Sequence, residues 1–146
     1  MRGLQDAGFT AYVVGGAVRD LLLGQRPKDF DVATDALPEQ VRQVFRRSRL
    51  IGRRFRLAHL LYRGEIIETS TFRAPVPEGD TDLCENTFKA EDTGMVMRDN
   101  VFGTPEQDAL RRDFTVNALF YNIADFSIID YAGGLEDLKK KIIRVI

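Results

Sequence analysis

A pair of adjacent glycines near the N-terminus constrains the fold of this 146-residue chain more than any other feature. The apolar, β-prone residues 9–14 lead directly into Gly15 and Gly16, and residues 17–23 then follow a helical pattern that stops at Gly24. A second short strand that begins with two aspartates comes next. A strand, a glycine turn, a helix and another strand are therefore predicted in close succession.

The turn and the helix after it have the properties of a phosphate-binding site. Gly15 and Gly16 let the backbone approach a ligand closely. The helix N-terminus that follows them offers free N–H groups and a positive dipole end, which suit phosphate. Arg19 lies in the first helical turn and would add a forked, permanently charged contact. A glycine pair alone is usually only a turn, so this interpretation depends on the residues that follow.

The two aspartates predict a metal site. Asp29 and Asp31 lie two residues apart on the predicted strand, so both side chains leave by the same face, roughly 6–7 Å apart. Without a counter-ion, two carboxylates at about 6 Å repel by about 3 kcal/mol at an effective dielectric of 20. A pair of Mg²⁺ ions removes that cost and is the usual device for phosphoryl or nucleotidyl displacement. The alternative is a pair of solvated acids without a bound metal. The succession of glycine turn, helix and acids favours the metal site over that alternative.

This stretch resembles the first signature of the class II nucleotidyltransferases, the family of CCA-adding tRNA nucleotidyltransferases and bacterial poly(A) polymerases. The signature reads Gly-Gly-x-x-Arg-Asp-x-x-x-Gly-x-x-Pro-x-Asp-x-Asp. Its fixed positions are all matched, by Gly15, Gly16, Arg19, Asp20, Gly24, Pro27, Asp29 and Asp31. Residues 111–119 resemble the second signature, Arg-Arg-Asp-Phe-Thr-x-Asn-(Ala/Ser)-(Leu/Met), and residues 130–138 resemble a third pattern, Asp-x-x-Gly-Gly-x-x-Asp-Leu.

The resemblance implies two-metal nucleotidyl transfer, in which an RNA 3′-hydroxyl attacks the α-phosphate of a nucleoside triphosphate. Asp29 and Asp31 would hold two Mg²⁺ ions, with Glu68 assisting as a third catalytic carboxylate. Two adjacent arginines followed by an aspartate also make chemical sense beside a triphosphate and a ribose. The residues implied in substrate binding are Gly15, Gly16, Arg19, Arg112, Asp113 and Asn117. For the second signature, the alternative is a salt bridge at a helix end.

Glu68 is also singled out by its place in a predicted hairpin. Residues 55–62 and 65–72 are strand-like and are joined at Arg63-Gly64. In the second strand Glu68 shares a face with Ile66 and Ser70, so its carboxylate stands on an otherwise short or apolar side. Such a carboxylate needs a partner, which the metal ions would provide. An ion pair with a neighbouring arginine is the alternative.

Charge is strongly segregated along the chain, although the formal net charge is only −1. Residues 40–64 contain eight arginines and no acid, whereas residues 78–108 contain nine acids and two bases. A local basic face favours nucleic-acid binding more than the net charge suggests. We predict RNA contacts from Arg53, Arg54 and Arg56. A solvated helix face and a basic edge strand would give the same pattern.

The choice of RNA product depends on residues 50–60. They resemble the segment that marks bacterial poly(A) polymerases: two aliphatics, a glycine, two bases, a phenylalanine, then an aliphatic and His59. The resemblance therefore implies addition of AMP from ATP to RNA 3′ ends, with CCA addition to tRNA as the alternative. His59 is expected to be a structural partner near the site. A non-catalytic nucleotide- or RNA-binding module and a small-molecule nucleotidyltransferase also remain open.

The predicted fold is α/β (α+β), with a mixed, mainly antiparallel sheet flanked by helices. Further helices are predicted over 38–47 and 105–112, the second with a capping box from Thr104 to Gln107. Strands are expected at 119–123 and 127–130, followed by a helix to Lys141 and a strand that begins at 142–146. The Pro- and Gly-containing acidic stretch 74–94 is predicted to be a flexible loop.

The resemblance further implies that residues 1–146 form the catalytic head of a longer enzyme. In this family a neck, a body and a tail follow the head, and the neck carries a Glu-Asp-x-x-Arg motif that selects the incoming base. That motif is absent from this sequence. Cys84 is the sole cysteine, and no apolar run approaches the roughly 20 residues of a membrane span. A cytoplasmic protein without membrane contact is expected, while its oligomeric state cannot be inferred.

Overall fold

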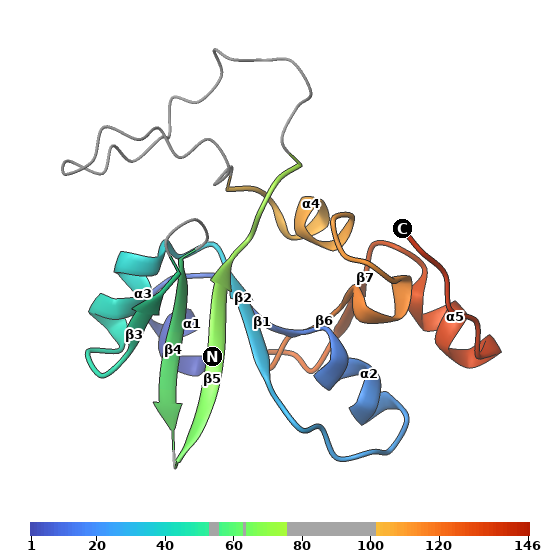
Figure 1. The fold of residues 1–146 in the computed structure, drawn as a ribbon, viewed down its shortest axis with the longest axis horizontal. Coiled ribbons are helices and arrows are strands. Elements are labelled where there is room, and N and C mark those ends of the chain that lie inside the picture. The colour runs from blue at the N-terminus through green and yellow to red at the C-terminus, as the bar shows by residue number, and fades with distance from the viewer. Residues whose placement is uncertain (53–55, 63, 76–101) are drawn as a thin grey trace.

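The computed structural model describes residues 1–52, 56–62, 64–75 and 102–146, and its strands form one seven-stranded sheet (Figure 1). The order across the sheet is β3-β4-β5-β2-β1-β6-β7. The β2–β5 pair is parallel, and the other neighbouring pairs in this sheet are antiparallel. The predicted mixed, mainly antiparallel sheet is therefore confirmed. The strands are β1 (Ala11–Val14), β2 (Asp31–Thr34), β3 (Arg49–Ile51), β4 (Leu57–Tyr62), β5 (Glu65–Thr71), β6 (Leu119–Tyr121) and β7 (Ile128–Asp130).

Short helices flank the sheet. Figure 1 shows α3 near β3 and β4 at one end of the molecule, and α2 and α5 beyond β6 at the other. The predicted capping box is present at the start of α4, where Thr104 accepts from the Gln107 N–H and Gln107 accepts from the Thr104 N–H. None of the helices in the described part of the chain has the length and apolarity to cross a membrane. The helices are α1 (Arg2–Asp6), α2 (Gly16–Leu22), α3 (Pro38–Val44), α4 (Pro105–Ala109) and α5 (Gly134–Lys140), with a 3₁₀ turn η1 (Thr115–Asn117).

Alternation along the strands places apolar side chains on both faces of the sheet. On one face, Val32 and Ala58 pack with Leu4 of α1 and Val41 of α3. On the other face, a cluster of buried residues includes an aromatic group and a residue of α4, namely Val14, Ala33, Phe72, Ala109, Ala118 and Phe120. The polar residues described below lie on this second face. There, α4 contributes Ala109 to the buried cluster that contains Phe72 and Phe120.

The expected strand at 142–146 is wrong. The segment makes a single antiparallel bridge, from Val145 to Phe114, and α5 ends at Lys141 with a left-handed φ of 57°. The Arg144 side chain turns back onto Asp137, with Nε 2.9 Å from the carboxylate, which holds the segment against η1 and α5. Repeated pairing does not develop. Of residues 74–94, predicted as a flexible loop, those beyond Pro75 lie outside the described residues, as do Arg53 and Arg54.

Candidate active site

Three chemically active side chains form a row across three strands of the sheet. The parallel register of β2 and β5 pairs Asp31 with Glu68, and the antiparallel register of β4 and β5 pairs Glu68 with His59. Direct partners on neighbouring strands project from the same face, with Cβ atoms about 5 Å apart. Glu68 Oε2 lies 3.4 Å from His59 Nε2. The charge of Glu68 also acts on the Arg73 guanidinium, where it opposes the lowering of the pKa.

Asp29 does not lie on the strand, contrary to the sequence-based prediction. β2 begins at Asp31 because its partner β1 ends opposite it, at Val14. The chain then turns away at Gly15, whose φ is 75°. Asp29 therefore approaches Asp31 from the connection that precedes β2. It still lies close enough to raise the pKa of Asp31, although more weakly than Glu68 does.

The carboxyl of Asp31 has a raised pKa for two main reasons. Burial is the larger cause, and the charge of Glu68 is the second; the guanidinium of Arg112 acts in the opposite direction. Asp31 keeps solvent-exposed surface at the mouth of the site. Protein atoms on its other sides still displace part of its hydration, and this favours the neutral form. A cation beside Asp31 and Glu68 would reverse that preference.

Asp31 and Glu68, the carboxylate row, line a pocket of about 500 Å³ whose lining also includes three arginines, the cationic wall. Arg111 and Arg112 come from the segment after α4, and Arg73 follows β5. The pKa of the Arg73 guanidinium is lowered by burial and then by Arg111, which is how closely spaced cations behave in a partly desolvated site. The pocket is lined by Val14, Asp31, Leu57, Glu68, Ser70, Arg73, Asp108, Arg111 and Arg112.

The first and second signatures meet through Arg19. Its Nη1 donates to the Asn117 side-chain oxygen at 2.7 Å, and its Nε and Nη2 donate to Asp20. Asn117 in turn donates to Asp113, which also accepts the N–H of Phe114. Arg19 is therefore held by protein groups on two sides, with 35% of its side chain exposed for a ligand.

The glycine pair forms the turn that the sequence predicts. Gly15 is the N-cap of α2, with φ 75° and ψ −139°, and Gly16 begins the helix. An added Cβ on Gly15 would lie 3.3 Å from Nη1 of Arg112. The turn thus runs directly beside the cationic wall, and only glycine combines this backbone conformation with such a close approach.

Some site residues were missed by the sequence-based prediction. Arg73 and Asp108 line the pocket, but neither was assigned a role. Asp108 stands four residues before Arg112, the spacing of a helical ion pair, and that spacing was an available signal. Arg56 lies outside this pocket and pairs with Glu39 at 2.7 Å, so its predicted RNA contact stays a prediction.

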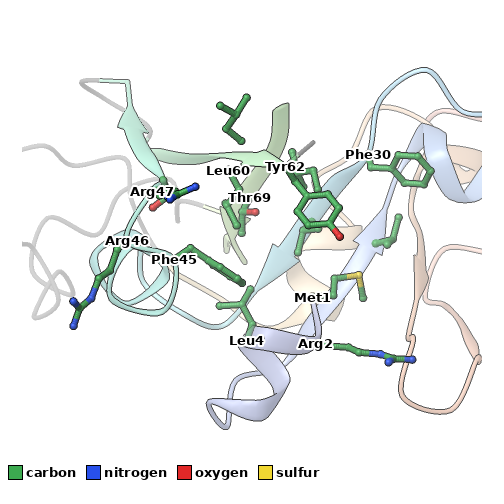
Figure 2. Close-up of a pocket in the computed structure, with 16 residues that line it drawn as sticks. Met1, Arg2, Leu4, Phe30, Phe45, Arg46, Arg47, Leu60, Tyr62 and Thr69 are labelled. Atoms are coloured by element: carbon green, nitrogen blue, oxygen red, sulfur yellow. The ribbon is translucent and has the colours of Figure 1, made fainter. Parts of the chain in front are cut away.

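A second hollow, of about 650 Å³, lies on the other face of the sheet (Figure 2). Figure 2 shows Leu4, Phe45 and Leu60 around it, with Arg46 and Arg47 at one side. Its lining contains no acidic residue, so it offers nothing to hold a divalent cation. Of the acids that the sequence singles out for metal binding, Asp31 and Glu68 line the first pocket and not this one.

The acids of the site suit a magnesium ion whose coordination is completed by the phosphates of a bound substrate. Within the described residues, no group of three or more His, Cys, Asp or Glu side chains is arranged to hold a metal ion. Mg²⁺ is commonly bound by only one or two carboxylates, with waters and substrate phosphates completing its shell. Asp31 and Glu68 supply that minimal set of hard oxygen ligands, and the repulsion between them favours a cation.

Comparison with known proteins identifies the family. Residues 11–144 match the family model described as "Poly A polymerase head domain". The chain belongs to this family. Enzymes of the family are nucleotidyltransferases that generally need divalent cations.

Poly(A) polymerases and CCA-adding enzymes both match this chain over nearly its whole length. Poly(A) polymerase I of Haemophilus influenzae is 56% identical over 144 residues, which cover 98% of this chain and 31% of that protein. The CCA-adding enzyme of Lactobacillus helveticus is 38% identical over 146 residues, or 100% of this chain and 33% of the relative. The crystal structure of the Bacillus stearothermophilus CCA-adding enzyme in complex with CTP is similar, with a TM-score of 0.77 and 34% identity. The match covers 99% of this chain and 31% of that one, so this chain spans about a third of these family members.

Proposed function

We propose that this chain is the catalytic head of a template-independent RNA nucleotidyltransferase that adds AMP from ATP to RNA 3′ ends. The supporting observation is the higher identity to poly(A) polymerase I, 56% against 38% for a CCA-adding enzyme, over a head that both share. The pocket agrees with such chemistry, because its lining combines the acids Asp31 and Glu68 with three arginines. Residues 1–146 act as one head, and the remaining parts of the enzyme lie outside this chain.

In the proposed reaction, the RNA 3′-hydroxyl attacks the α-phosphate of ATP and pyrophosphate leaves. Asp29 and Asp31 would hold two Mg²⁺ ions, with Glu68 assisting as a third carboxylate. When bound there, Mg²⁺ supplies Lewis-acid activation of the hydroxyl and neutralises the leaving phosphates. Arg111 and Arg112, which line the pocket, bind the triphosphate. The Gly15–Gly16 turn and Arg19 contact it from the start of α2. Asp113 and Asn117 orient the ribose.

The carboxylate assignment is tested in the full-length enzyme. Asp29→Ala or Asp31→Ala should abolish AMP transfer without lowering the thermal unfolding temperature of the head, because both acids are exposed to solvent. The exposed Asp6 on α1 provides a matched control, Asp6→Ala, that should retain full activity. Either site variant that keeps more than about a hundredth of the wild-type rate, a loss below about 2.7 kcal/mol, would contradict the assignment.

CCA addition is the second candidate, and the structural likeness to a CCA-adding enzyme bound to CTP supports it. A further similar structure is a tRNA nucleotidyltransferase complexed with a primer tRNA and an incoming ATP analog. The deciding experiment gives the full-length enzyme ATP and CTP, with a tRNA that ends before its CCA and with an unstructured RNA. Long A-tails on both RNAs support poly(A) addition. Three nucleotides added to the tRNA alone would establish CCA addition.

Base selection is proposed to come from outside this head. The chain should bind ATP and CTP with Mg²⁺ and discriminate between them less than about tenfold, or about 1.4 kcal/mol, in calorimetric titration. A larger preference would mean that the head itself reads the base. Magnesium-independent retention of RNA without triphosphate binding would instead indicate a non-catalytic module. RNA contacts through Arg53, Arg54 and Arg56 and a cytoplasmic location complete the proposal.

A further inference from the structure

Asp108 contacts two of the residues that line the pocket. Its Oδ2 accepts from Nη2 of Arg112 at 2.9 Å, and its Oδ1 accepts the backbone N–H of Arg73 at 3.1 Å. The residue is 8% exposed. Because both carboxylate oxygens are engaged by protein groups, Asp108 is built to hold its neighbours in place.

Arg112, the partner of Asp108, is closely surrounded. Its guanidinium carbon lies 5.3 Å from the centre of the Phe120 ring, and Gly15 leaves room for Nη1 on another side. Its Nε is buried and has no hydrogen-bond partner in the described part of the chain. Burying a guanidinium with an unsatisfied N–H is costly. The ion pair with Asp108 compensates part of that cost and fixes the orientation of the Arg112 side chain.

The second oxygen of Asp108 joins this arginine to the carboxylate row. Arg73 follows β5 directly after Phe72, and β5 is the strand that carries Glu68. The bond from the Arg73 N–H to Asp108 therefore fixes α4 relative to that strand. Asp108 thus links Arg112 to the strand that carries Glu68.

We propose that Asp108 is a positioning residue that sets Arg112 in the orientation in which it meets the triphosphate. The inference rests on the proposed function. An arginine ordered before the substrate arrives loses less conformational freedom on binding than one that must be ordered at that moment. Asp108 acts through Arg112 and does not itself touch the substrate.

The test is a double-mutant cycle in the full-length enzyme. Asp108→Asn retains an oxygen for the Arg73 N–H but removes the charge that holds Arg112. We expect kcat/KM for ATP to fall about tenfold, mainly through KM, as is typical when a supporting partner is removed. In an Arg112→Ala background the same change should cost less than about twofold, because the residue through which it acts is gone. Glu106→Gln, on an exposed position of α4, is the control and should change neither value.

The outcomes separate positioning from simple stability. An equal loss of kcat/KM in both backgrounds would show that Asp108 only stabilises the fold, and would overturn the inference. Should the Asn variant unfold at the assay temperature, Asp108→Glu carries the same test, because it keeps the charge but displaces the guanidinium. ATP affinity is measured for the same four proteins. A wild-type enzyme that transfers no AMP would refute the proposed function, while the affinity cycle would still decide the role of Asp108.

Discussion

Neutralising Glu68 should make the metal-free protein more stable, even though it removes a proposed metal-binding carboxylate. Glu68 is the direct register partner of Asp31 on parallel strands, which lie about 4.8 Å apart. Two charges at about 5 Å repel by about 0.8 kcal/mol in water and about 3 kcal/mol at an effective dielectric of 20. Because 46% of the Glu68 side chain is exposed, solvent screening reduces this to about 0.5–1.5 kcal/mol.

The sign follows from the raised pKa of Asp31. A carboxyl whose pKa is higher in the folded state than in the unfolded state destabilises the fold once the pH rises above its unfolded value. Glu68 is the second cause of that rise, after burial. Glu68→Gln removes this charge, so the free energy of unfolding at pH 8 should increase by about 0.5–1.5 kcal/mol.

The assay is urea unfolding in EDTA, at low and at high salt. With a typical slope of about 1–3 kcal/mol per molar urea, the midpoint should rise by a few tenths of a molar or more. The gain should shrink at high salt because screening weakens the repulsion. Added Mg²⁺ should stabilise the wild type more than the variant. Glu65→Gln, at the exposed start of the same strand, is the control. A variant that is less stable than the wild type at low salt, or a gain that Glu65→Gln reproduces, would refute the reasoning.

Three further predictions concern the acids and the close packing around η1. As the pH is lowered, the head should begin to lose Mg²⁺ affinity at a higher pH than an ordinary carboxyl would cause, because burial and then Glu68 raise the pKa of Asp31. Titration of the protein with Mg²⁺ between about pH 5 and 8 measures this. Asp137 has a lowered pKa through hydrogen bonds from Arg144 and then Thr115, so it stabilises the fold above about pH 4 and loses this effect as the pH falls through its folded pKa. Asp137→Asn should therefore flatten the acid limb of a urea-midpoint profile, and an unchanged limb would contradict the assignment. Gly134→Ala should destabilise the fold by about 3 kcal/mol or more in thermal unfolding, because an added Cβ would lie 2.1 Å from the Thr115 carbonyl oxygen; a variant that unfolds with the wild type would show that η1 yields easily.

Features governed by neighbouring residues were predictable from the sequence. The glycine turn requires a backbone conformation that only nearby residues determine, and the capping box of Thr104 and Gln107 is completed within one helical turn. The hairpin between β4 and β5 follows from alternation and a glycine at its turn. Strand alternation and the family resemblance both singled out Glu68, but its position directly beside Asp31 depends on the register between distant strands.

The parts that sequence reasoning missed depend on contacts between distant segments. Asp29 was placed on a strand because the Asp-x-Asp spacing fits one, but the length of β2 is set by where its partner β1 ends. The role of Asp108 required knowing that the backbone of Arg73 passes beside α4. The segment at 142–146 has strand-like composition, yet the ion pair between Arg144 and Asp137 holds it against α5.

The hydrogen bond between Arg19 and Asn117 joins positions 98 residues apart in the sequence. Contacts of such long sequence separation form late, because the intervening chain must first be ordered. During synthesis, a ribosome-bound chain that ends before α4 would carry the glycine turn and both acids of the carboxylate row, but not the residues of the second signature. A nascent or truncated head should therefore be inert toward ATP until nearly all of the domain has emerged. The topology thus delays the assembly of the proposed nucleotide-binding site until most of the head has been synthesised.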